Sequence, residues 1–192
     1  VAAFPFLANI APRENLKSYL VYFSSALRHI VFWSLPATAL IIILRAHIVR
    51  IILGAGLFGW EDTRLTAAAL ALFSIALVPQ GLIGLYIRAF FAAGYTKIPF
   101  MVNLAGSALT IILSFGSLYL YSSEPAFSVL ADSIMRVSDI ENAGILMLPL
   151  AFSIGSLATL IMLAYYFKKT WGALDGKTFL HSILQITAAA AL

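Results

Sequence analysis

Long apolar runs separated by short charged segments make up the pattern of this chain. Residues 65–87, 98–123 and 142–167 each form a run without a charged side chain. A helix needs roughly 20 apolar residues to cross a bilayer, and all three runs are longer than that. Each of these three runs therefore predicts a membrane-spanning helix.

The first part of the chain has a less regular pattern. The uncharged run 30–44 is shorter and contains Pro36, so it predicts a short span that preceding helical turns extend. Residues 15–28 carry apolar side chains at about helical spacing. They predict either an interfacial amphipathic helix or the solvated first turns of the span that follows. Residues 51–60, which are rich in glycine, predict an interfacial helix and loop.

The remaining segments complete a membrane topology. Val1–Ala11 and Thr178–Leu192 predict two truncated spans, and residues 124–141 predict a polar loop with a short surface helix. We find no internal repeat strong enough to assert. The expected fold is an all-α polytopic membrane protein with about four complete transmembrane helices, two truncated ones, short interfacial helices and no soluble domain. We interpret the chain as an internal piece of a longer protein.

The composition agrees with this fold class. The chain is 62% hydrophobic and 10% charged, with a mean hydropathy of +0.98, whereas soluble domains are about 25% charged. No cysteine occurs, and the three histidines lie in separate segments without a metal-binding spacing. We therefore expect no enzyme activity, no metal and no cofactor. The basic residues do not cluster as nucleic-acid binding requires.

The placement of Lys and Arg predicts the orientation. Because successive spans alternate in direction, the basic residues divide between the two sides of the membrane. One side has eight: Arg13, Lys17, Arg28, Arg88, Lys97, Lys168, Lys169 and Lys177. The other has four: Arg45, Arg50, Arg64 and Arg136. Cytoplasmic loops carry the excess of positive charge, so the first group is predicted to face the cytoplasm.

The turn between the second and third spans carries the most specific motif. Its sequence from Arg88 to Pro99 is Arg-Ala-Phe-Phe-Ala-Ala-Gly-Tyr-Thr-Lys-Ile-Pro. Gly94 can supply a positive φ, and Pro99 can start the next helix. This turn resembles the pattern Arg-Ala-Phe-Tyr-Ala-x-Gly-Asp-Thr-Lys-Thr-Pro of the MviN/MurJ family of lipid II flippases. Tyr95 and Ile98 depart from that pattern.

Three further stretches resemble the same family in the same order. They are Ser34-Leu-Pro-Ala-Thr-Ala, the segment from Ile48 to Thr63, and Ala151-Phe-Ser-Ile-Gly-Ser-Leu-Ala. The resemblance implies a segment of one lobe of a fourteen-helix flippase, from the end of the eighth helix to the start of the thirteenth. It implies as partners the N-terminal lobe of the same protein, membrane lipids and a lipid-pyrophosphate-linked sugar, in the bacterial cytoplasmic membrane.

The implied function is flipping of lipid II by alternating access. The alternatives are a multidrug or polysaccharide exporter of the same superfamily, or a transport-inactive homologue that scaffolds cell-wall assembly. Long soluble domains beyond residue 192 would favour the scaffold. Several arginines in the cavity of the missing N-terminal half would favour an anionic pyrophosphate substrate.

Polar residues within the spans are the candidate site residues, because each needs a partner or water there. Gln80 follows Pro79, which can kink its helix, and is either cavity-lining or engaged in a helix–helix hydrogen bond. Asn103 is a second candidate for lining the cavity. Arg88 and Lys97 are expected either to contact a lipid pyrophosphate or to anchor the turn at headgroup level.

A cation site is the other candidate. In some relatives the positions that match Thr110 and Ser114 carry Asn and Asp that help to hold sodium. Both positions carry hydroxyls here, as does Ser153. The set Thr110, Ser114 and Ser153 thus lacks a carboxylate to offset sodium desolvation. Coupling to sodium, as opposed to the membrane potential, would depend on this set, and close helix packing by small residues is the alternative.

Overall fold

The computed structural model describes residues 16–54, 56, 58–125, 127–129, 133 and 143–172. Its elements are α2 (Leu16–Leu53), α3 (Trp60–Ile75), α4 (Leu77–Ala92), α5 (Lys97–Ser123), the 3₁₀ turn η1 (Ala143–Leu146) and α7 (Met147–Trp171). Four stretches are long and apolar enough to cross a membrane: Leu16–Leu53, Trp60–Ala92, Lys97–Ser123 and Ala143–Trp171. The predicted all-α class and its four complete spans are confirmed. The two truncated spans and most of the predicted surface helix lie outside the described residues.

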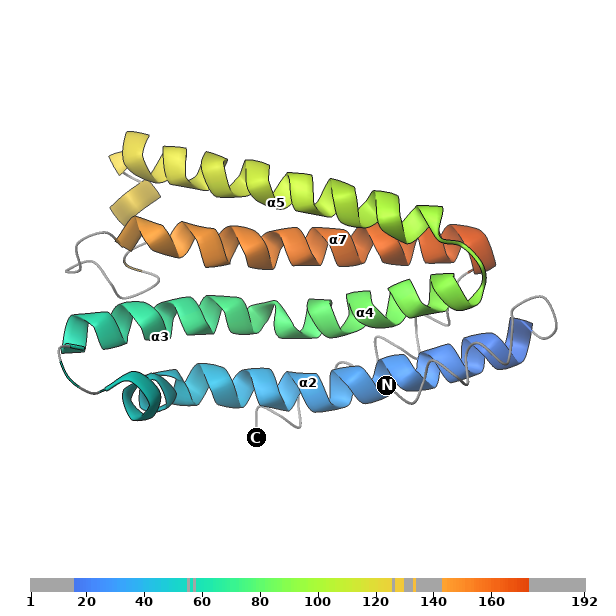
Figure 1. Cartoon of the computed structure of the whole chain (residues 1–192), viewed down its shortest axis with the longest axis horizontal. Helices are drawn as coiled ribbons and strands as arrows, with labels where there is room; N and C mark the ends of the chain where they lie inside the picture. Colours follow the sequence, from blue (N-terminus) through green and yellow to red (C-terminus); the bar gives the residue numbers. More distant parts are fainter. Residues whose placement is uncertain are drawn as a thin grey trace.

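The long helices run side by side in the order α2, α3 with α4, α7, α5 (Figure 1). α7 packs mainly against α5 and also contacts α3 and α4. Many large apolar side chains on α2 and α5 are exposed, including Trp33, Ile43, Ile112 and Phe115. These outward faces suit contact with lipid acyl chains, because hydrocarbon solvates them as well as a protein core does.

The first span is longer than the sequence pattern predicted. Residues 16–28 do not form a separate interfacial helix, because α2 is continuous over 38 residues. The alternative interpretation, solvated first turns of the span, agrees with the structure. At 1.5 Å per residue α2 is about 57 Å long, against about 30 Å for a hydrocarbon core. Lys17 and Arg50 near its ends are exposed and can lie outside the hydrocarbon. Residues 51–53 close this helix instead of forming an interfacial one.

The second span is interrupted in the middle, as Pro79 predicted. α3 ends at Ile75 and α4 begins at Leu77. Proline has no backbone N–H, so Pro79 cannot donate to the carbonyl of Ile75. The chain tightens at the break, where the Ala76 N–H donates to the Phe73 carbonyl oxygen at 3.0 Å. The regular helical pattern resumes after Pro79, where the Gln80 N–H donates to the Ala76 carbonyl oxygen at 2.9 Å.

The turn from α4 to α5 has the predicted glycine geometry. Gly94 has φ of 81°, a value that residues with a Cβ rarely adopt. The Tyr95 N–H donates to the Phe90 carbonyl at 2.9 Å, and the Gly94 N–H donates to Phe91 at 3.0 Å. This pair of bonds is a Schellman motif, which satisfies carbonyls at the end of α4.

An aromatic cluster packs beneath this turn and joins three helices. The rings of Phe23 on α2 and Phe167 on α7 stack with centroids 4.3 Å apart, and Phe90 on α4 meets Trp171 on α7 at 5.0 Å. Tyr19 on α2 is fully buried and donates its hydroxyl to the Ala89 carbonyl at 2.9 Å. The turn is therefore fixed by non-local contacts as well as by Gly94.

α5 and α7 meet through two reciprocal glycine–threonine contacts. A Cβ placed on Gly106 of α5 would overlap Oγ1 of Thr159 on α7, and a Cβ on Gly155 would overlap Oγ1 of Thr110. Each glycine and threonine of one helix are four residues apart, within Gly-Ser-Ala-Leu-Thr on α5 and Gly-Ser-Leu-Ala-Thr on α7. These antiparallel segments are thus related by an approximate two-fold axis. Two five-residue segments are too short to identify a repeat from the sequence alone. Their contact across α5 and α7 is what relates them.

Candidate functional site

Three of the polar residues within the spans form hydrogen bonds between neighbouring helices. Gln80 on α4 donates from Nε2 to Oγ of Ser156 on α7 at 3.0 Å. Ser153 on α7 donates to the Leu72 carbonyl on α3 at 2.6 Å. Ser153 and Ser156 are buried, whereas Gln80 is exposed on the surface of this chain. Both bonds cross the line where α7 meets the interrupted span, on either side of the break at Ala76.

Gln80 makes the helix–helix hydrogen bond that was one of the two alternatives from the sequence, and its role in lining a cavity stays a prediction. Its amide nitrogen makes a helix–helix hydrogen bond, while the residue keeps an exposed surface. An amide oxygen has two acceptor lone pairs, so the carboxamide can serve a second partner. Among the candidates within the spans, Gln80 is the one whose side chain is held by a neighbouring helix while the residue remains exposed.

The other intramembrane candidates bond locally. Asn103 donates from Nδ2 to the Pro99 carbonyl at 2.9 Å. Thr110 donates to Gly106 at 2.9 Å, and Ser114 donates to Thr110 at 2.8 Å. Each of these bonds reaches four residues back along α5, where it satisfies the side chain without a neighbouring helix. Asn103 is half-buried, so its amide oxygen can still accept a hydrogen bond.

The three candidate cation ligands do not fit a sodium site. Thr110 packs against Gly155 of α7, while Ser153 is bonded to α3, so the structure does not bring these residues to one point. α5 and α7 contain no carboxylate, and within the described residues no group of three or more His, Cys, Asp or Glu side chains lies together. Hydroxyls alone leave the desolvation of sodium uncompensated. The geometry matches the alternative, close packing by small residues.

Two further hydroxyls were not selected from the sequence. Ser34 Oγ and Thr38 Oγ1 are buried and have no hydrogen-bond partner. They flank Pro36, which lies inside α2. The Cγ2 atom of Ile30 lies 3.1 Å from the position of a Cβ on Gly81. Since the two helices are antiparallel (Figure 1), Pro36 then lies at about the level of Ile75, where the second span breaks.

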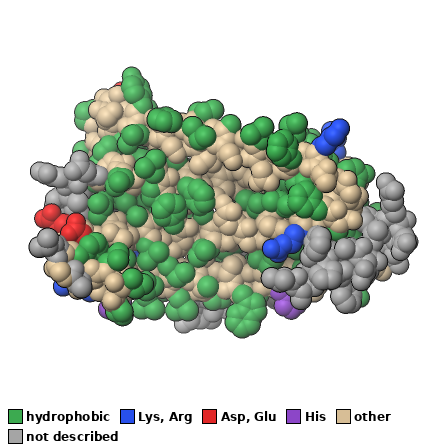
Figure 2. Space-filling model, in the orientation of Figure 1, with side chains coloured by type: hydrophobic (Ala, Val, Ile, Leu, Met, Phe, Trp, Pro, Cys, Tyr) green, Lys and Arg blue, Asp and Glu red, His purple; other side chains and the backbone are tan. Residues whose placement is uncertain are grey.

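Four basic residues gather at one end of the helices, whereas the described acidic residues lie at the other end, toward which Arg45, Arg50 and Arg64 also lie. Arg88, Lys97, Lys168 and Lys169 lie at the end where α4 meets α5 and where α7 closes, and all four are exposed. The described acidic residues, Glu61, Asp62 and Glu124, lie at the other end. Figure 2 shows acidic side chains at the left end of the molecule and an apolar surface between the ends. Arg88 and Lys97 thus lie at one end of this apolar surface, and their contact with headgroups or with a lipid pyrophosphate stays a prediction.

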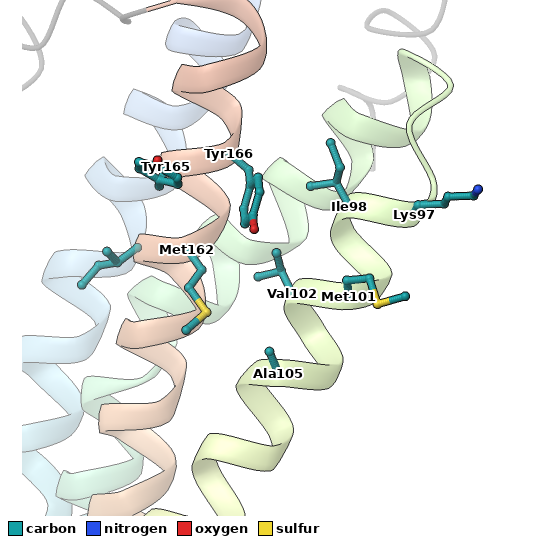
Figure 3. Close-up of a pocket in the computed structure, with 9 residues that line it drawn as sticks. Lys97, Ile98, Met101, Val102, Ala105, Met162, Tyr165 and Tyr166 are labelled. Carbon is teal, nitrogen blue, oxygen red and sulfur yellow. The ribbon is translucent and has the colours of Figure 1, made fainter.

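An apolar groove opens between α5 and α7 at this basic end. It has a volume of about 770 Å³. Its walls include Lys97, Met101 and Ala105 from α5 and Met162, Tyr165 and Tyr166 from α7. Figure 3 shows Tyr166 directed into the space between the helices, and Lys97 extending outward at the rim. Both the size and the mainly apolar walls of this groove are typical of small-molecule sites.

Comparison with known proteins gives a consistent result. A family model described as "Lipid II flippase MurJ" matches residues 1–192. A "Probable lipid II flippase MurJ" from Thermotoga maritima is 33% identical over 100 residues, which is 52% of this chain and 20% of that protein. The match thus spans about a fifth of that relative's length. No solved structure matches the chain.

Proposed function

Because this chain belongs to the MurJ family of lipid II flippases, we propose that it forms part of the C-terminal lobe of a fourteen-helix flippase. That protein moves the lipid-linked peptidoglycan precursor lipid II across the bacterial cytoplasmic membrane by alternating access. The chain supplies the segment from the end of the eighth helix to the start of the thirteenth, and its partner is the N-terminal lobe. The family match over all 192 residues is the observation that carries this proposal.

The distribution of polar groups supports a transport role. A flippase must shelter a sugar–pyrophosphate head while the lipid tail remains in hydrocarbon, so its cavity needs a few fixed polar groups at membrane depth. Gln80 has this character, because Ser156 holds its amide nitrogen while the residue stays exposed. We assign to Gln80 and Asn103 hydrogen bonds with the polar head of the substrate. Arg88 is assigned to the pyrophosphate at the cytoplasmic mouth.

The orientation in this proposal follows from charge. With the turn at Gly94 in the cytoplasm, Arg88, Lys97, Lys168 and Lys169 face the anionic inner leaflet. The acidic residues Glu61 and Asp62 then lie on the opposite side, at the start of α3. The break at Ala76 falls between these two levels, in the interior of the membrane.

The function is tested by rescue of cells depleted of their lipid II flippase. The full-length protein that contains this chain is expected to restore growth and the appearance of lipid II in the outer leaflet. Membrane expression without either effect would reject the proposal. The two readouts together separate transport from a scaffolding role, which would support growth without moving lipid II.

The role of Gln80 is tested with a matched pair of variants. Gln80→Leu removes both the interhelical bond and the exposed amide. Ser156→Ala keeps the amide and removes the interhelical bond, together with the bond from the Ser156 hydroxyl to the Phe152 carbonyl within α7. A substrate-binding role predicts a large loss of flipping for Gln80→Leu and near-normal flipping for Ser156→Ala. Equal losses in the two variants would show that Gln80 acts through packing alone.

A further inference from the structure

The groove between α5 and α7 exists because of how these two helices approach each other. They approach closely at Gly106–Thr159 and Gly155–Thr110, where neither glycine has room for a Cβ. Helices that cross at a close contact diverge away from it, and the groove begins at Ala105, the residue next to Gly106. It then continues to Lys97, the first residue of α5. The groove is therefore a direct consequence of the glycine–threonine packing.

The groove opens on the outer surface of the chain. Met101 and Tyr165 in its walls are 61% and 62% exposed. The floor of the groove adjoins the buried cluster that contains Leu163 and Phe167, because Val102 belongs to that cluster and Met162 packs against it. An opening on the outer surface of a membrane helix pair meets lipid chains before it meets a polar solute.

We propose that this groove binds one acyl chain of an anionic phospholipid of the inner leaflet, with the lipid phosphate at Lys97. This site goes beyond the proposed flipping of lipid II and does not depend on it. From Lys97 to Ala105 the groove extends about 12 Å along α5. One leaflet of hydrocarbon is about 15 Å thick, so the groove matches most of the depth of a single acyl chain.

The charges at the rim determine which lipid fits. Lys97 lies at the groove, and Lys168 and Lys169 follow Tyr165 and Tyr166 within the next turn of α7. The described acidic residues all lie at the opposite end of the helices. The tyrosines add hydroxyls at the depth where aromatic side chains meet headgroups. A phosphate with net negative charge is thus favoured over a zwitterionic headgroup.

Lipid binding to the purified full-length protein in detergent tests this proposal. Native mass spectrometry with phosphatidylglycerol and phosphatidylcholine is expected to show preferential retention of phosphatidylglycerol. A lysine near an anionic surface contributes about fivefold in affinity. Lys97→Gln should therefore weaken the binding of phosphatidylglycerol by about that factor and change the binding of phosphatidylcholine little. Lys97→Glu should reverse the preference without removing any packing.

The apolar part of the site is tested by filling it. Ala105→Trp should abolish retention of both lipids in the groove. Leu104→Trp is the matched control, because Leu104 is 59% exposed at the same depth and is not part of the groove wall. Thermal unfolding of the variants reports whether each is folded, and Lys97→Glu remains informative if Ala105→Trp is not.

Several results would overturn the proposal. Wild-type protein without a preference for phosphatidylglycerol would do so, as would equal losses for Lys97→Gln and for Lys17→Gln at the exposed start of α2. Unchanged retention in Ala105→Trp would show that lipid lies elsewhere. Displacement of phosphatidylglycerol by a polyprenyl pyrophosphate would assign the groove to the transported lipid. None of these measurements requires flipping, so failure here leaves the transport proposal standing.

Discussion

Substitution of Gly106 by alanine is expected to separate α5 from α7. The added Cβ would overlap Thr159 Oγ1 and lie 3.1 Å from the Cβ and Cγ2 atoms of the same threonine. Thr159 cannot move away easily, because it is buried and its hydroxyl donates to the Gly155 carbonyl at 2.8 Å. The helices must therefore shift apart at their closest point.

The magnitude follows from two opposing effects. Overpacking a close contact costs about 1–3 kcal/mol, while replacing a helical glycine by alanine recovers about 1 kcal/mol of helix propensity. We expect a net loss of about 1–2 kcal/mol for Gly106→Ala. Gly116→Ala is the matched control on the same helix, because no atom lies within 4 Å of a Cβ there. That variant should gain about 1 kcal/mol.

The assay is equilibrium unfolding of the full-length protein in detergent micelles, for the wild type and both variants. A double variant that combines Gly106→Ala with Thr159→Ala tests the cause, because it removes the Oγ1 atom that the new Cβ would meet. The pair should show a coupling of about 1 kcal/mol. Equal stability changes for Gly106→Ala and Gly116→Ala would refute the packing argument.

Three other substitutions probe separate features. Thr38→Val removes a buried hydroxyl without a partner and should stabilise the protein by about 1 kcal/mol in the same assay. Thr63→Val is its control and should destabilise the protein, because the Thr63 hydroxyl donates to the Gly59 carbonyl at 2.8 Å. A loss of stability in both variants would contradict the assignment. Tyr19→Phe removes the bond to Ala89 while keeping the ring, so a loss of about 1 kcal/mol is expected, and no measurable loss would show that the bond adds nothing. Pro79→Ala restores a donor for the Ile75 carbonyl and should increase hydrogen-exchange protection at position 79; fast exchange there would mean that the break has another cause.

The features predicted from the sequence are those that depend on neighbouring residues. Pro79 and Gly94 act on the backbone within one helical turn. The break at Ala76, before α4, and the turn at Gly94, after α4, were therefore both predictable. Span lengths follow from the count of uncharged residues for the same reason. The sequence was less informative about the length of α2. The charges of Lys17 and Arg28 determine which part of the helix can lie in hydrocarbon, but neither residue interrupts the helix.

The features that escaped prediction depend on the register between helices. Gly106 and Thr159 lie on different helices, far apart in the sequence, and only their contact shows why one is small and the other β-branched. The same holds for the candidate site. Gln80 was selected as a polar residue in a span, but its partner Ser156 and the split between Thr110 and Ser153 required the packing of α7. Ser34 and Thr38 differ from other hydroxyls only in lacking a partner.

The two sides of the helix layer differ in their capacity to bend, and this difference suits the proposed transport cycle. α5 and α7 are held at two glycine–threonine contacts, where a relative shift would create overlap. α2 and the α3–α4 span instead carry Pro36 and Pro79, each of which removes one backbone hydrogen bond. The Ile30–Gly81 contact brings Pro36 near the level of the break. Alternating access needs a part that moves and a part that does not. In the proposed flippase, bending would then concentrate at this level while α5 and α7 move as one body.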